Sequence, residues 1–150
     1  MFANFNYDKF PLVYVIFSES LASEEEFDNF LKEWLVLYHN QNNFMYIFDT
    51  RMMKIISPIY SLKMAFFIKK LRKQPIHYLE KSLILVNDNR IKKLLDMVFT
   101  LQSPVAPVYL WMTERIDKDE IYNMCENCSV DNILEDMIYI KPNSSLIPFL

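Results

Sequence analysis

Four runs of consecutive apolar residues alternate along the chain with segments of helical periodicity, and this alternation most constrains the fold. The runs cover residues 12–17, 44–48, 82–86 and 108–112. A strand that is apolar on both faces needs cover on both faces, which is typical of parallel sheets. We therefore predict an α/β fold in βαβαβαβα order, with a mostly parallel or mixed sheet of four or more strands and helices packed on it.

Capping residues and apolar spacing predict where the helices begin. Ser23 and Glu26 form a capping box. Ser57 is the predicted N-cap of a second helix, with Pro58 as its first residue and its end near Lys73. A third helix is predicted after the turn 87–89, and a fourth after Asp117, which forms a cap with Glu120. A further short helix is predicted at Ile133, Leu134 and Met137.

The chain of 150 residues predicts a single domain, with an aromatic arm over 1–10 and an apolar tail over 142–150. The amino terminus lacks the basic and apolar regions of a signal peptide, and every uncharged apolar stretch is far shorter than the ~20 residues of a membrane span. Twelve lysines against four arginines, with no glycine at all, indicate an AT-rich genome. We expect a cytoplasmic protein, or one of the virion interior if it is viral.

The absence of glycine also excludes several enzyme classes. Phosphate-binding loops, dinucleotide-binding turns and nucleophile elbows all need backbone positions that glycine occupies easily. Cys125 and Cys128 are half of a zinc site without a second half, and we interpret them as incidental. We therefore predict no enzyme activity, no cofactor and no metal site.

Carboxylates follow the predicted strands, where a ligand crevice of a parallel sheet would lie. They are Glu19, Asp49, Asp88 and Glu114. Together they could hold Mg²⁺, but Arg51, Arg90 and Arg115 each lie one or two residues from one of them. Local ion pairs and helix caps are the interpretation that we prefer.

Charge is distributed in three blocks. Residues 1–50 carry two basic and eight acidic side chains, 51–93 carry eleven and two, and 94–150 carry three and nine. The net charges are therefore −6, +9 and −6. The basic centre either pairs with the acidic ends inside one domain or contacts a partner. A sequence pI of about 5.4 and the absence of a nucleic-acid-binding motif argue against nucleic acid as that partner.

The predicted helix 58–73 carries the most informative surface. One arc holds Tyr60, Met64, Phe67, Ile68 and Leu71 and should face the sheet. The opposite arc mixes Ile59, Leu62 and Phe66 with Lys63, Lys69, Lys70 and Lys73. This mixture suits docking on an anionic membrane surface or on a protein partner. The alternative is that the arm or the tail covers the three apolar residues.

Two segments carry a resemblance to known families. FMYIFDTRMMKIISPIYSLKMAFFIKKL resembles the STAS domain of sulfate transporters and anti-sigma-factor antagonists, in which a buried strand ends in Asp and a Ser starts the next helix. YLEKSLILVNDNRIKKLLDMVF is similar to the divergent CRAL-TRIO lipid-binding domain, in which a strand ends at Asn and a helix follows directly. The resemblance covers about residues 10–125. It implies a binding or regulatory module, with Ser57 as the counterpart of a regulatory serine.

These observations predict a non-catalytic binding or regulatory module that docks through the helix 57–73 and adjacent loops. Its partner is expected to be a protein or an anionic membrane surface, and it could form a homo-oligomer. The alternative is a structural or virion-associated protein that self-assembles, which the aromatic arm, the apolar tail and the charge blocks favour. The candidate binding residues are Ser57, Ile59, Leu62, Lys63, Phe66, Lys69, Lys70, Lys73, Asn87 and Arg90.

Overall fold

One mixed sheet organises the computed structural model, which describes residues 1–54, 56–114, 116–127 and 137–142. The strands lie across the sheet in their order along the chain: β1 (Ala3–Lys9), β2 (Leu12–Phe17), β3 (Phe44–Asp49), β4 (Leu79–Val86), β5 (Val108–Met112) and β6 (Met137–Ile140). β2 to β5 are parallel, while β1 and β6 pair antiparallel at the two edges. The predicted α/β fold is confirmed.

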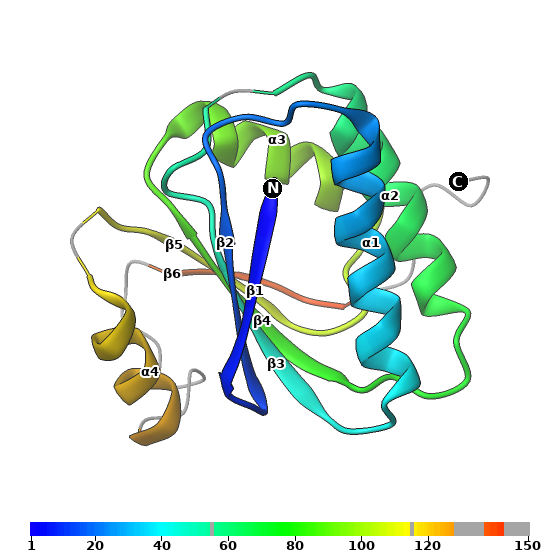
Figure 1. Cartoon of the computed structure of the whole chain (residues 1–150). Coiled ribbons are helices and arrows are strands. Elements are labelled where there is room, and N and C mark those ends of the chain that lie inside the picture. Colours follow the sequence, from blue (N-terminus) through cyan, green and yellow to red (C-terminus); the bar gives the residue numbers. More distant parts are fainter. Residues whose placement is uncertain (55, 115, 128–136, 143–150) are drawn as a thin grey trace.

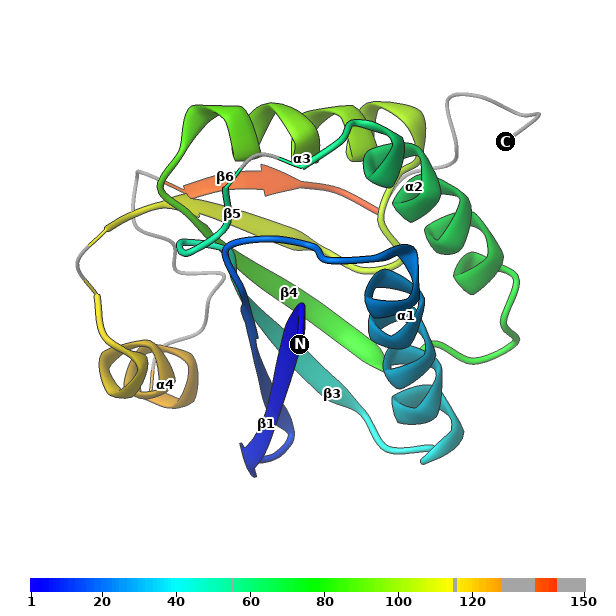
Figure 2. The same ribbon diagram turned by 45° about the horizontal axis from the view of Figure 1, so that its top comes forward.

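Three of the four described helices cover one face of this sheet, and the fourth lies on the other (Figure 1, Figure 2). The helices are α1 (Glu24–His39), α2 (Ile59–Arg72), α3 (Asn89–Leu101) and α4 (Lys118–Asn127). Each right-handed crossover from β2 to β5 advances in the same direction, so α1, α2 and α3 must share a face. The β5–β6 connection is antiparallel and is free to place α4 on the opposite face.

The predicted caps hold the helices in place. The Ser23 Oγ accepts a hydrogen bond from the Glu26 N–H (3.4 Å), and the Glu26 carboxylate accepts one from the Ala22 N–H (2.9 Å). Asp117 accepts from the Glu120 N–H at the start of α4 (2.8 Å). Apolar residues of α1, α2 and α3 then pack on alternate residues of the strands to form the larger core, which includes Phe30, Trp34, Tyr46, Phe67 and Leu110.

The two edge strands were not predicted from the sequence. The segment expected to be an aromatic arm forms β1, with Phe2 and Ala3 buried in the larger core and Phe5 packed against it. Met137, predicted in a short helix, begins β6 and pairs with Trp111. The rest of that predicted helix, and the predicted apolar tail from residue 143 on, lie outside the described residues.

A turn after α1 shows a consequence of the missing glycine. Gln41 has a φ of 59°, the one positive φ among the described residues. A left-handed backbone costs a residue with a Cβ about 1–2 kcal/mol, and helices commonly end on a glycine at such a position.

We therefore expect Gln41→Gly to stabilise the chain by about 0.5–1 kcal/mol, because the new residue adopts this φ without strain. Urea unfolding of the two proteins measures the difference. Asn43→Gly, in the same exposed turn but without a positive φ, should give no gain. Equal effects at the two positions would contradict this explanation.

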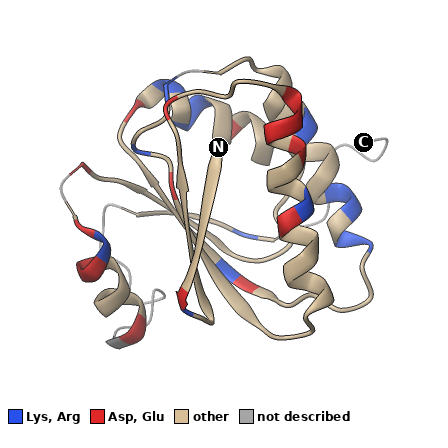
Figure 3. Ribbon diagram, viewed as in Figure 1, with Lys and Arg blue, Asp and Glu red and all other residues tan. Residues whose placement is uncertain are grey.

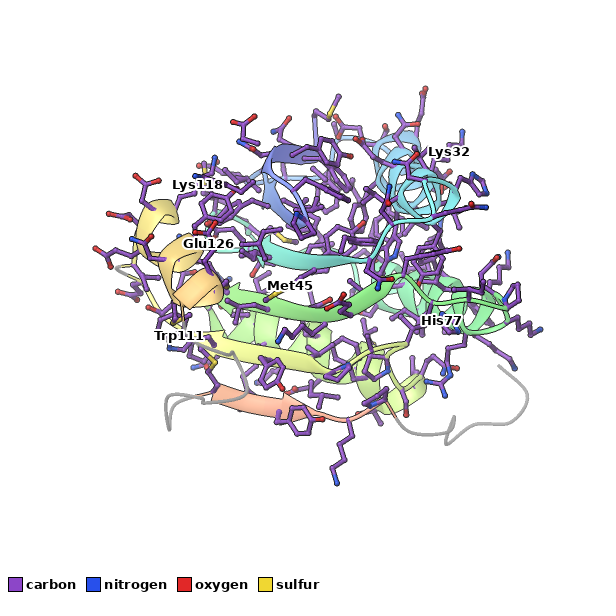
Figure 4. All side chains as sticks on the ribbon, turned by 90° about the horizontal axis from the view of Figure 1, so that it is seen from below. Lys32, Met45, His77, Trp111, Lys118 and Glu126 are labelled. Carbon is purple, nitrogen blue, oxygen red and sulfur yellow. The ribbon has the colours of Figure 1, made fainter. Side chains whose placement is uncertain are left out.

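The second face of the sheet is covered in part by α4. Ile121 and Tyr122 of α4 are buried, and Met45 and Trp111 belong to the same smaller core. Figure 4 shows this region, with Lys118 and Glu126 on α4 and with Met45 and Trp111 projecting from the strands beside it. No helix among the described residues is both long and apolar enough to cross a membrane.

Candidate docking surface

Helix α2 is anchored to the domain along one side. Phe67, Ile68 and Leu71 are buried, in the arc predicted to face the sheet. Ser61 and Ala65 are also buried, because their small side chains allow α3 to approach. The Ser61 hydroxyl donates a hydrogen bond to the Leu94 carbonyl oxygen (3.0 Å). This anchoring determines which residues of α2 face outward.

Solvent reaches apolar side chains on the opposite side of α2. Ile59 is 47% exposed and Phe66 is 43% exposed, while Leu62 between them is partly buried. Ile59 and Phe66 are therefore exposed among the described residues, and the expected arm forms β1 at the edge of the sheet, while the expected tail from residue 143 on lies outside the described residues. We call this surface the α2 outer face; it comprises Ile59, Leu62, Lys63, Phe66, Lys69, Lys70 and Lys73.

Charge changes sign along this surface. At its amino-terminal end the Lys63 ammonium donates to the Glu24 carboxylate (2.5 Å), and this hydrogen bond raises the pKa of Lys63. Lys70 and Lys73 are exposed at the carboxyl-terminal end. Figure 3 shows the acidic residues gathered at the start of α1 and the basic residues at the end of α2. The α2 outer face is therefore apolar in its middle and basic at its carboxyl-terminal end, and the acidic first turn of α1 adjoins its amino-terminal end through the Glu24–Lys63 pair.

Ser57 lies just before α2. Its Oγ accepts a hydrogen bond from the Ile59 N–H (3.4 Å). The N-cap position is occupied by Pro58, so the helix begins at Ile59, one residue later than predicted. The delay arises because residues 57–60 first close a turn, in which the Tyr60 N–H donates to the Ser57 carbonyl oxygen (3.1 Å).

Asn87 and Arg90 are not part of this surface. They lie at the carboxyl end of β4 and the start of α3, whereas Lys70 and Lys73 lie at the carboxyl-terminal end of α2. These two ends are on opposite sides of the molecule (Figure 1, Figure 2). The Arg90 guanidinium is paired with Asp88 (2.8 Å), which also caps α3. The ten candidate residues therefore divide between two places.

Among the described residues, three of the four carboxylates that follow the strands are paired with basic side chains. Asp88 caps α3 and forms an ion pair with Arg90, and the Glu19 carboxylate lies 3.6 Å from the Lys54 ammonium nitrogen. No group of three or more His, Cys, Asp or Glu side chains in the described part of the chain is placed to hold a metal ion. Glu114 is exposed, and its neighbour Arg115 lies outside the described residues. The interpretation as local pairs and caps is confirmed for Asp88.

Asp49 belongs to a buried hydrogen-bond network, of which the sequence indicated only the pairing with Arg51. Its carboxylate accepts hydrogen bonds from the Tyr14 hydroxyl (2.7 Å) and, in a bidentate pair, from the Arg51 guanidinium (2.9 and 2.8 Å). Arg51 also donates to the Ile116 carbonyl oxygen (2.6 Å), which precedes α4. Burial alone would raise the pKa of Asp49, but the hydrogen bonds from Arg51 and Tyr14 hold it below its usual value. The network fixes the connection that leads to α4.

Cys125 of α4 is a free, partly buried thiol, and Cys128 lies outside the described residues. Burial raises the pKa of Cys125 to about 11, so the group is protonated at neutral pH. A protonated thiol is a poor nucleophile and a poor metal ligand.

Comparison with known proteins found no match: no family model, no curated protein and no solved structure matches the chain.

Proposed function

We propose that this chain is a non-catalytic interaction module that docks on a protein partner through the α2 outer face. The observation that carries the proposal is the exposure of Ile59 and Phe66, which lie seven residues apart on one side of α2 and are flanked by exposed Lys70 and Lys73. Apolar residues inside a rim of charge are the usual composition of protein interfaces. The STAS-like and CRAL-TRIO-like resemblance is part of the same proposal, since it implies a binding module.

The charge pattern favours a protein over an anionic membrane. A membrane surface of this kind is negative everywhere and attracts basic segments by about 1 kcal/mol for each lysine near it. Here the exposed Glu24 and Asp28 of α1 lie near Lys63 at the amino-terminal end of the α2 outer face, and an anionic membrane would repel them. A protein partner can present basic groups at one end and acidic groups at the other.

Photo-crosslinking in the native cell tests the proposal. We expect a benzophenone side chain at position 66 to form adducts with a protein, and the same group at position 97 of α3 to form none. Met97 is a matched control because it is 40% exposed, close to Phe66. Lys70→Glu with Lys73→Glu should remove the adducts at position 66. Equal adducts at both positions would contradict the proposal.

Vesicle co-sedimentation separates the two classes of partner. Phosphatidylserine-rich vesicles should leave the protein in the supernatant at physiological salt. If the protein sediments with them, and Phe66→Ala abolishes the sedimentation, then the partner is a membrane surface and the proposal of a protein partner is wrong.

A further inference from the structure

We infer that the partner of the α2 outer face is a second copy of this chain, related to the first by a two-fold axis. The inference rests on the proposed docking function and deepens it by naming the occupant. A two-fold interface uses the same patch on both copies, so the patch must be complementary to itself. The charge and apolar pattern over α1 and α2 meets this requirement.

Helices α1 and α2 lie side by side and point in the same direction. Phe27 contacts Tyr60 with ring centroids 5.0 Å apart, and Trp34 contacts Phe67 at 5.3 Å. The same sequence offset separates the residues of both pairs, so the two helices keep one register over two turns. The start of α1 is therefore level with the start of α2, and the two helices run in the same direction (Figure 1).

The acidic groups beside the α2 outer face lie at one end. Glu25 and Asp28 are exposed in the first turns of α1, and Glu24 beside them holds Lys63. The basic groups lie at the other end, where Lys70 and Lys73 are exposed. A two-fold axis in the plane of the interface and perpendicular to the helices turns the second copy end for end. The acidic end of α1 in each copy then lies at the same end of the interface as the basic end of α2 in the other copy, diagonally across the seam.

The apolar residues occupy the middle of the same surface. Ile59 and Phe66 are separated by seven residues, with Leu62 between them. In an antiparallel pairing of α2 with its symmetry mate, Ile59 of one copy packs against Phe66 of the other, and Leu62 lies near the axis. Seven-residue spacing of apolar side chains is the pattern that lets two helices pack along a common seam.

The size of the apolar and charged patch determines how stable the dimer is expected to be. Two exposed apolar residues and a few exposed charges give an interface at the small end of specific protein contacts. The dimer should therefore be weak and reversible, and its population should rise with protein concentration and fall with salt, which screens the exposed charges.

Sedimentation equilibrium over a wide concentration range tests the inference, with circular dichroism to check that each variant is folded. We expect wild type to show a monomer–dimer equilibrium. Lys70→Glu with Lys73→Glu should weaken it about tenfold or more, because each substitution occurs twice in a two-fold dimer. Lys93→Glu with Lys92→Glu makes the same change of charge on α3 and should leave the equilibrium unchanged.

Charge exchange gives the stricter test. Glu25→Lys with Asp28→Lys should also self-associate more weakly than wild type when it is alone. An equimolar mixture of this variant with Lys70→Glu/Lys73→Glu should form heterodimers at concentrations where neither variant self-associates. Failure of the mixture to associate would overturn the two-fold arrangement, as would a wild type that stays monomeric at all concentrations. If wild type is monomeric while position 66 still crosslinks to a different protein in the cell, then the inference of a second copy is wrong and the proposed docking function stands. If both experiments fail, then both proposals are wrong.

Discussion

Two neighbouring phenylalanines of α2 should respond oppositely to the same substitution. Phe67→Ala should lower the free energy of unfolding by about 3–5 kcal/mol, because it removes a buried ring and leaves a cavity. Phe67 is 8% exposed and contacts Trp34 at 5.3 Å between ring centroids. Phe66→Ala should change stability by no more than about 0.5 kcal/mol, the range for surface substitutions. Urea unfolding of both variants measures the difference.

The pair decides whether the α2 outer face is surface or core. The two substitutions have the same helix propensity and the same chemistry, so they differ only in the direction that the side chain faces. If Phe66→Ala unfolds the domain, then the residue is core and the docking surface does not exist. If Phe67→Ala is neutral, then the packing of α2 described above is wrong.

Breaking the Asp49–Arg51 pair should also have a large effect. Arg51→Met should destabilise the chain by about 3 kcal/mol, the lower end for a buried pair that loses one partner, because the Asp49 charge is left buried with only the Tyr14 hydroxyl and the backbone N–H of residue 51 as described hydrogen-bond donors. The side chains of Arg51 and Asp49 are 15% and 12% exposed, so water replaces little of the lost interaction. Asp49→Asn with Arg51→Met should cost less than Arg51→Met alone, because no charge then stays buried.

The Asp49–Arg51 pair should also make the free energy of unfolding depend on pH. The pKa of Asp49 is lowered in the folded chain from its ordinary value of 3.8, so the folded form binds its proton less well than the unfolded form. Its contribution to stability is present at neutral pH and is lost as the pH falls below about 4. Wild type should lose more stability than the Asp49→Asn/Arg51→Met variant between pH 4 and pH 2. Parallel pH profiles of the two proteins would contradict this role for Asp49.

The central strands and helices were predictable because each carries a local signal. The runs 12–17 and 108–112 coincide with β2 and β5, and Ser23, Asp88 and Asp117 each cap a described helix. The outward side of α2 was predictable too, since at about 100° per residue Ile59 and Phe66 lie about 120° and 140° around the helix from the buried Leu71.

The edge strand β1 was missed although its signal is present. Ala3, Phe5 and Tyr7 alternate with Asn4 and Asn6, the period of a strand with one covered face. Continuous apolar runs identify only strands that are covered on both faces, and β1 does not carry such a run. The alternation of apolar and polar residues is the signal in the sequence that identifies β1.

The Asp49 network depends on long-range pairing that one sequence does not show. Tyr14 and Asp49 are brought together because β2 and β3 pair in parallel register, with Ile16 opposite Asp49. The contact of Arg51 with Ile116 joins segments separated by 65 residues. The separation of Arg90 from Lys70 has the same origin, because it follows from the parallel arrangement of α2 and α3 and not from their sequences.

Hydroxyl-radical footprinting tests the docking surface most directly, because it compares the same side chains in the native assembly and in the dilute purified protein. The docking account predicts that Phe66 and Ile59 become protected in the assembly, while Met97 of α3 and Ile76 after α2, which are 40% and 58% exposed, react equally in both states. Equal reactivity of Phe66 in the two states, or protection of Met97 in its place, would show that the chain meets its partner elsewhere.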